Sequence, residues 1–96
     1  MNTYMILFNY TEQGIRTVRD GASRLDGLKR RLQELGGTVQ SFYLTMGPYD
    51  TVAVVTVPDD ATMARLALWL GAAGNVRTLT MRAFGEEEYR QIVTAL

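Results

Sequence analysis

The sequence predicts an α+β domain with a four-stranded antiparallel sheet, two helices on one face of that sheet and a short C-terminal helix. Segments rich in β-branched and aromatic residues alternate with helical segments in the order strand, helix, strand, strand, helix, strand. The chain of 96 residues is long enough for one hydrophobic core and too short for two, so we expect a single domain over residues 1–96. A content of 47% hydrophobic and 21% charged residues is typical of a folded globular protein.

The first strand and the first helix are predicted from composition and spacing. Aromatic and branched residues run over 3–10 and stop at the polar segment 11–14, which predicts a strand followed by a loop. From about Asp20 apolar residues recur at helical spacing, and Gly36 and Gly37 provide a stop signal. The apolar stripe of this helix consists of Leu25, Leu28, Leu32 and Leu35.

The remaining elements follow from turn and capping signals. Segments 38–46 and 50–57 are rich in β-forming residues and only Gly47-Pro48-Tyr49 separates them, so we expect a hairpin. Residues 58–60 (Pro-Asp-Asp) are a helix-start signal, and that helix should run to about Gly71 or Gly74. A strand is expected over 75–84, and the glutamates at 86–88 then open a short helix with negative charge at its favourable end.

This order of elements is the split βαβ, or ferredoxin-like, βαββαβ pattern. Right-handed crossovers place the strands in the antiparallel order 4-1-3-2 with both main helices on the same face. The other face of the sheet is then left without a helix.

Both faces of the predicted sheet are apolar, although a face in water should carry polar residues at alternate positions. In the first strand the alternate sets are Tyr4, Ile6, Phe8 and Tyr10 against Met5 and Leu7. In the hairpin they are Phe42, Leu44 and Met46 against Val39 and Tyr43, and Val52 and Val54 against Ala53, Val55 and Val57. Monomers rarely expose so large an apolar patch, so we expect two copies to pack face to face as a dimeric α+β barrel. The alternative is a monomer whose terminal helix folds back over the face.

The second helix suggests further contacts between copies, because it is apolar almost all round beyond its first turn. Helices of this kind are usually buried on every side. Alanine on the outer face can be explained by its helix propensity, but Leu68 and Trp69 cannot. An assembly larger than a dimer, using these two residues, is therefore a further expectation.

The composition excludes several classes of function. Ten basic and ten acidic side chains cancel, so we expect no nucleic-acid or membrane partner. The absence of Cys and His removes thiolate and imidazole chemistry, and we expect neither a metal nor a cofactor. Carboxylates interrupt the basic cluster between Arg24 and Arg31, which favours a solvated helix face. No signal peptide or membrane span is evident, so a cytoplasmic location is expected.

Five segments of the chain together resemble the GYD-domain family. They are 42–50 (Phe-Tyr-Leu-Thr-Met-Gly-Pro-Tyr-Asp), 58–60 (Pro-Asp-Asp), 74–78 (Gly-Asn-Val-Arg-Thr), 82–84 (Arg-Ala-Phe) and 86–89 (Glu-Glu-Glu-Tyr). The Gly, Tyr and Asp that name the family are matched by Gly47, Tyr49 and Asp50, and the loop at 11–14 is also similar. The resemblance implies the dimeric α+β barrel superfamily but brings no established activity with it. Gly85 departs from the Ser or Thr expected before the glutamates, which implies a weaker helix cap.

Six residues are candidates for binding a small molecule. Tyr49 and Asp50 end the hairpin turn, where a phenol and a carboxylate could act together at the mouth of the barrel. The alternative, which turn propensities favour, is that Asp50 accepts hydrogen bonds from backbone amides while Tyr49 packs on a neighbour.

The other four candidates lie on the first and last strands. Asn9 and Tyr10 close the first strand, and the Asn9 amide could orient a ligand or be satisfied by protein. Arg77 and Arg82 are five residues apart, so they should point to opposite faces. Either could bind an anion, although an ion pair with Glu86 or Asp50 is favoured.

Three functions remain open from the sequence. The first is a self-associating module that binds or senses a small molecule. The second is a cofactor-independent enzyme, monooxygenase-like or isomerase-like, with Tyr49, Asp50 and Asn9 as its polar set, and fold analogy alone supports it. The third is a purely structural assembly protein with a filled barrel.

Overall fold

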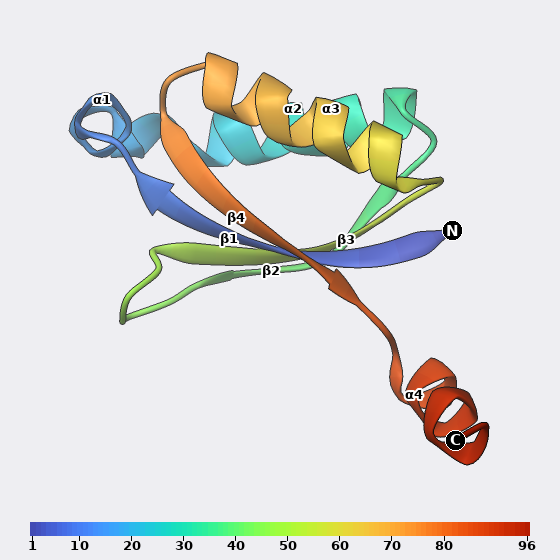
Figure 1. Ribbon diagram of the computed structural model, residues 1–96. Coiled ribbons are helices and arrows are strands. Elements are labelled where there is room, and N and C mark those ends of the chain that lie inside the picture. The colour runs from blue at the N-terminus through green and yellow to red at the C-terminus, as the bar shows by residue number, and fades with distance from the viewer.

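A computed structural model describes all 96 residues and confirms the predicted α+β fold (Figure 1). The four strands form one antiparallel sheet in the order β2-β3-β1-β4, which is the expected order. Helices α2 and α3 lie together on one face, and α4 lies on the other side of the sheet (Figure 1). The elements are β1 (Asn2–Tyr10), α1 (Glu12–Arg16), a 3₁₀ turn (Val18–Asp20), α2 (Gly21–Glu34), β2 (Thr38–Leu44), β3 (Thr51–Val57), α3 (Asp60–Ala72), β4 (Val76–Ala83) and α4 (Glu86–Thr94).

The core lies between the sheet and the two helices that cover it. Alternate residues of β1 and β3 point toward the helices, where Ile6 and Val55 have no exposed surface. Leu32 of α2 and Leu66 of α3 are equally buried above them. The 3.6-residue period of the helices and the 2-residue period of the strands thus bring these four apolar side chains into one layer.

The polar segment after β1 is a short helix, and our expectation of a loop there was wrong. Thr11 begins it, because its hydroxyl accepts a hydrogen bond from the Gly14 N–H at 3.0 Å. Gly14 also packs against the chain before β4, where an added Cβ would lie 1.8 Å from the Asn75 carbonyl oxygen. The Thr cap and the bare glycine therefore let α1 fit closely beside the start of β4.

The hairpin formed by β2 and β3 is confirmed, but its connection is longer than predicted, because β2 ends at Leu44 and β3 begins at Thr51, which leaves Met46 in the connection. The faces of β2 also differ from the expected alternation. A register shift between Val39 and Ser41 places Val39 opposite Val55 and Phe42 opposite Ala53. Val39 therefore lies on the helix-covered face with Phe42, where both pack against the core. Strict alternation put Val39 on the face of Tyr43, and the bulge reverses that assignment because it adds one residue to β2.

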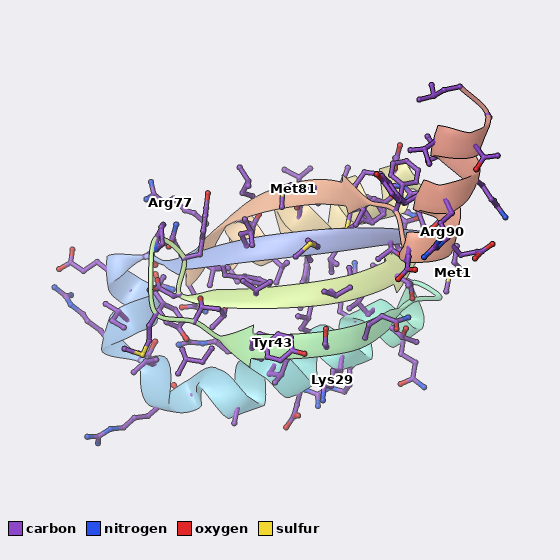
Figure 2. All side chains as sticks on the ribbon, turned by 90° about the horizontal axis from the view of Figure 1, so that it is seen from below. Met1, Lys29, Tyr43, Arg77, Met81 and Arg90 are labelled. Atoms are coloured by element: carbon purple, nitrogen blue, oxygen red, sulfur yellow. The ribbon has the colours of Figure 1, made fainter.

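The helix-free face of the sheet is apolar and nothing in the chain covers it. Its residues meet in opposite pairs, with Met5 beside Val54 and Met81, and Leu7 beside Val52 and Leu79. Figure 2 looks onto this face and shows Tyr43 on β2 and Met81 on β4, with no helix in front of the strands.

The terminal helix does not fold back over the sheet. Helix α4 extends beyond the end of β4 on the helix-free side (Figure 1), and none of its residues is buried. The backbone amide of Gly85, just before the helix, donates to the Glu88 carboxylate at 3.3 Å, but the glycine supplies no side-chain cap. The alternative of a monomer sealed by its own terminal helix is therefore wrong for this chain.

Candidate functional site

An apolar pocket of about 200 Å³ lies between α2, α3 and the sheet, at the end where β1 stops and β4 begins. The strands form its floor and the two helices its walls. Four aromatic rings line it, belonging to Phe8, Tyr10, Phe42 and Trp69. The hairpin connection lies at the same end of the sheet (Figure 1). The pocket thus lies at the end of the sheet that carries the hairpin turn, but on the helix-covered face and not on the face predicted to line a barrel.

The pocket is left open because both helices end their core-facing stripes in small residues there. On α2 the spacing of Leu32, Leu28 and Leu25 continues to Gly21 at the first helical position. A Cβ at Gly21 would meet nothing within 4 Å. On α3 the same series ends at Ala73, which also lines the pocket. Since the helices are antiparallel, these two small residues lie above the same part of the sheet.

Polar groups occur at a few points of the pocket wall. The Arg24 guanidinium donates to the carbonyl oxygens of Gly14 at 3.3 Å and Thr17 at 3.1 Å, so it is engaged with α1. The side-chain oxygen of Asn75 accepts from Gln13 at 3.0 Å. Thr51 is only 5% exposed, and its hydroxyl makes none of the side-chain hydrogen bonds found in the protein. The Thr51 hydroxyl is thus free of protein partners but not sealed off, since the one buried side-chain polar atom without a partner is Nε of Arg31.

Of the two candidate residues at the hairpin turn, Asp50 is held by hydrogen bonds to the backbone of β1. Its carboxylate accepts from the Tyr10 backbone N–H at 2.8 Å, and its own N–H donates to the Phe8 carbonyl at 2.8 Å. These bonds join the hairpin to the end of β1. The Tyr49 carbonyl accepts from the Thr45 hydroxyl at 2.6 Å, and neither Tyr49 nor Asp50 lines the pocket. Of the six predicted residues only Tyr10 does so.

The other predicted residues separate onto the two faces of the sheet. Asn9 of β1 and Arg77 of β4 lie directly opposite each other on the helix-free face. Figure 2 labels Arg77. Arg82 lies on the opposite face, beside Tyr4. The two arginines therefore point to opposite faces, as their spacing predicts.

Within the single chain, neither Arg77 nor Arg82 forms an ion pair with Glu86 or Asp50. Glu86 is paired with Arg90 at 2.7 Å, and Asp50 is engaged with the backbone. The Arg82 guanidinium instead donates to the carbonyls of Thr3 and Ala83 and stacks 4.4 Å from the centroid of the Phe84 ring. Its role at the end of the sheet is accounted for by protein contacts.

Tyr4 and Asp60 form a polar contact that the sequence did not reveal. The buried Tyr4 hydroxyl donates to the Asp60 carboxylate at the start of α3. Burial raises the pKa of the Tyr4 phenol above its usual 10.0, and the hydrogen bond to Asp60 raises that pKa further. The phenol thus stays protonated and anchors α3 to β1.

No three carboxylates come together as the ligands of a metal ion would. None of the helices has both the length and the apolar character that crossing a bilayer requires.

Trp69, Thr51 and Arg24 line the pocket but were not predicted as site residues. Trp69 was identified only as a contact between copies, and Thr51 begins an ordinary strand. The available signal was Gly21, which stands four residues before Leu25 where the helical period asks for an apolar side chain. Where the space left by the missing side chain of Gly21 lies over the sheet depends on how α2 crosses the strands.

Comparison with known proteins places the chain in a family. The family model described as GYD domain matches residues 4–93. A relative from Thermus thermophilus, named glutamine synthetase and cystathionine beta-lyase binding protein, is 36% identical over 84 residues, which are 86% of this chain and 88% of the relative.

Solved structures agree with the fold. The crystal structure of TTHA0845 from Thermus thermophilus is similar with a TM-score of 0.54 and 28% identity, over 88% of this chain and 95% of that one. The crystal structure of FFRP-DM1 has a TM-score of 0.62 at 19% identity, over 88% of this chain and 100% of that one. A hypothetical protein from Pyrococcus horikoshii, PHS023, has a TM-score of 0.57 at 20% identity, over 90% and 93% of the two chains. Because the family model matches residues 4–93, which are most of the chain, the chain belongs to the GYD-domain family.

Proposed function

We propose that this GYD-domain protein is a self-associating binding module that works as a homodimer. In the dimer the helix-free faces of two copies pack together and close an α+β barrel. The observation that carries this proposal is the apolar, uncovered face of the sheet, where Leu79 is 46% and Met81 42% exposed in the single chain. Soluble monomers rarely expose a continuous apolar surface across four strands, and a second sheet is its natural cover.

Helix α4 supports the same arrangement. It has nine residues and no buried side chain, and a helix of that length is marginally stable without tertiary packing. Its apolar side chains remain exposed. They are Tyr89, Ile92, Val93 and, beyond the helix, Leu96. The helix lies on the side of the sheet from which a second copy would approach (Figure 1). In the proposed dimer α4 packs against the flank of the partner.

A binding role is favoured over catalysis. The enzyme hypothesis relied on Tyr49, Asp50 and Asn9 as a polar set, but the Asp50 carboxylate is committed to the Tyr10 amide and Asn9 lies beside Arg77. We expect Asn9 and Arg77 to face the partner sheet, where they are the polar groups available to a molecule held between the sheets. We retain a cytoplasmic location as part of the proposal.

Protein partners are a second candidate for what the module binds. The Thermus thermophilus relative is named as a binding protein for two enzymes, and the present chain carries an exposed apolar site on α3. Leu68 is 74% and Trp69 40% exposed there, with the Arg31 guanidinium 5.6 Å from the centroid of the Trp69 ring. Aromatic and arginine side chains are typical anchors of protein interfaces.

Light scattering on size-exclusion fractions tests the dimer. The wild type at micromolar concentration should have about twice the 10.7 kDa mass of the chain, or an even multiple if Leu68 and Trp69 join dimers. Leu79→Lys places a charge in the proposed interface and should give a monomer of unchanged circular dichroism.

Leu68→Lys is the matched control, because it makes the same change at an exposed position of α3. It should keep the dimer and remove only a larger assembly. A wild type that elutes and scatters as a stable monomer would contradict the proposal.

A further inference from the structure

We propose that the pocket between α2 and α3 binds a small, neutral, monocyclic aromatic molecule with one hydrogen-bonding substituent. The proposal rests on the binding role proposed above and names the site and the class of ligand. Each subunit holds the whole pocket, so the site does not require the dimer.

The open space at Gly21 is not required by the backbone. Gly21 has ordinary helical angles, with φ −57° and ψ −40°, which any residue adopts. Nothing lies within 4 Å of the position of its missing Cβ, so a larger side chain would meet no obstacle. Glycine is also a poorer helix former than alanine. Because Gly21 lines the pocket, a larger side chain there would take up part of it, whereas glycine leaves a space of a ligand's size.

The size and walls of the pocket select an aromatic ring. A dry cavity of about 150 Å³ is known to accept benzene, and this pocket of about 200 Å³ leaves room for a small substituent. Phe8, Phe42 and Trp69 come from three different elements, so a bound ring meets aromatic surface on several sides. Offset and edge-to-face contacts between rings are the favourable ones.

The polar groups of the pocket select the substituent and its charge. Thr51 lines the pocket and its hydroxyl takes part in no side-chain hydrogen bond of the chain, so we assign it the hydrogen bond to a hydroxyl or carbonyl on the ring. No carboxylate lines the pocket, which disfavours a cationic ligand. Arg24 is held by Gly14 and Thr17, so a buried anion would lack a free charged partner. A neutral phenol or aromatic ketone satisfies these conditions.

The test uses 4-methylphenol and toluene as probes, which differ by one hydroxyl. Trp69 is the only tryptophan and lies in the pocket, so its indole N–H signal reports binding in an NMR titration. We expect 4-methylphenol to bind with a Kd of about 1 mM or below and toluene about tenfold more weakly. Thr51→Val keeps the shape of the side chain and removes its hydroxyl. That variant should bind the two probes equally.

Filling the pocket supplies the second variant. Gly21→Leu should abolish binding of both probes while leaving the circular dichroism and the mass in light scattering unchanged. Gly71→Leu is its matched control, since Gly71 is an exposed helical position outside the pocket where a Cβ also meets nothing within 4 Å. It should bind both probes as the wild type does.

Three results would overturn the proposal. The first is that neither probe shifts the Trp69 signal at millimolar concentration. The second is that Gly21→Leu binds the probes as tightly as the wild type does. The third is that Thr51→Val still prefers 4-methylphenol to toluene as strongly as the wild type does. Failure of the dimer is separate, because a monomeric wild type that binds 4-methylphenol contradicts the homodimer and supports this site. A dimer that binds neither probe contradicts this site alone.

Discussion

The two faces of the sheet are both apolar, but the chain covers only one of them. On the covered face Ile6 and Val55 have no exposed surface, because α2 and α3 lie over them. On the helix-free face Leu79 and Met81 keep more than two fifths of their surface exposed. Each of these helices joins two parallel strands that have one other strand between them in the sheet, and right-handed crossovers put both helices on the same side. Apolar alternation therefore shows which faces of a sheet must be covered, while the connections between strands decide whether the chain itself can cover them.

The largest expected effect is the loss of a core side chain from the covered face. In the monomeric Leu79→Lys background, Leu66→Ala should lower the free energy of unfolding by about 2–5 kcal/mol, because Leu66 is fully buried and leaves a cavity. Met81→Ala on the other face should change it by less than about 0.5 kcal/mol. Urea denaturation followed by circular dichroism measures both. Equal losses at the two positions would contradict the comparison.

A smaller effect should come from Val39, which the bulge in β2 moves to the covered face. Val39→Ala removes two methyl groups that pack on the core and should cost about 1 kcal/mol in the same background. Tyr43→Ala removes a larger side chain, 60% exposed on the helix-free face, and should cost less. The reverse order in urea denaturation would show that the strand follows strict alternation, without the bulge.

The smallest effect concerns the anchoring of α3, which covers the core. Hydrogen bonds from the hydroxyl and then the backbone N–H of Thr62 hold the pKa of Asp59 below its ordinary 3.8. A carboxylate whose pKa is depressed by folding stabilises the protein above its ordinary pKa, and this contribution is lost as the pH falls through the folded value. The thermal midpoint of Asp59→Ala should therefore lie below that of the wild type at pH 7.

The difference between wild type and Asp59→Ala should narrow only below the ordinary pKa of 3.8. Asp59→Asn retains an oxygen that accepts the Thr62 amide bond and serves as the control. Its midpoint should stay close to that of the wild type at pH 7. If the difference in thermal midpoint between wild type and Asp59→Ala stayed constant down to strong acid, the charge of the carboxylate would not contribute to the stability of the helix cap.

Most of the fold was predictable because local signals and tertiary structure agree. The Asp59 cap, the glycines after α2 and the Pro-containing hairpin turn are chemical requirements that only a few residue types meet. The two errors have local causes. Thr11 begins a helix of only five residues, too short to show a period, and the bulge beside Val39 adds one residue that composition does not reveal.

The candidate site was much less predictable than the fold. Tyr49 and Asp50 drew attention as a polar pair, yet Asp50 satisfies the amide of Tyr10, as turn chemistry favours. The pocket forms because Gly21 at the start of α2 and Ala73 at the end of α3 lie together above aromatic residues of β1 and β2. Residues so distant in the chain form a site only through the way the helices cross the sheet.

The order of elements, the antiparallel sheet and the apolar character of both its faces can be predicted from residue patterns, because periodicity and caps are local properties. The tertiary structure decided that α4 stays off the sheet, that Val39 joins the covered face, and that the pocket lies under the helices near the hairpin. The physical reason is that a sheet apolar on both faces fixes the need for burial, whereas the cover each face receives depends on helix packing over long separations in the chain.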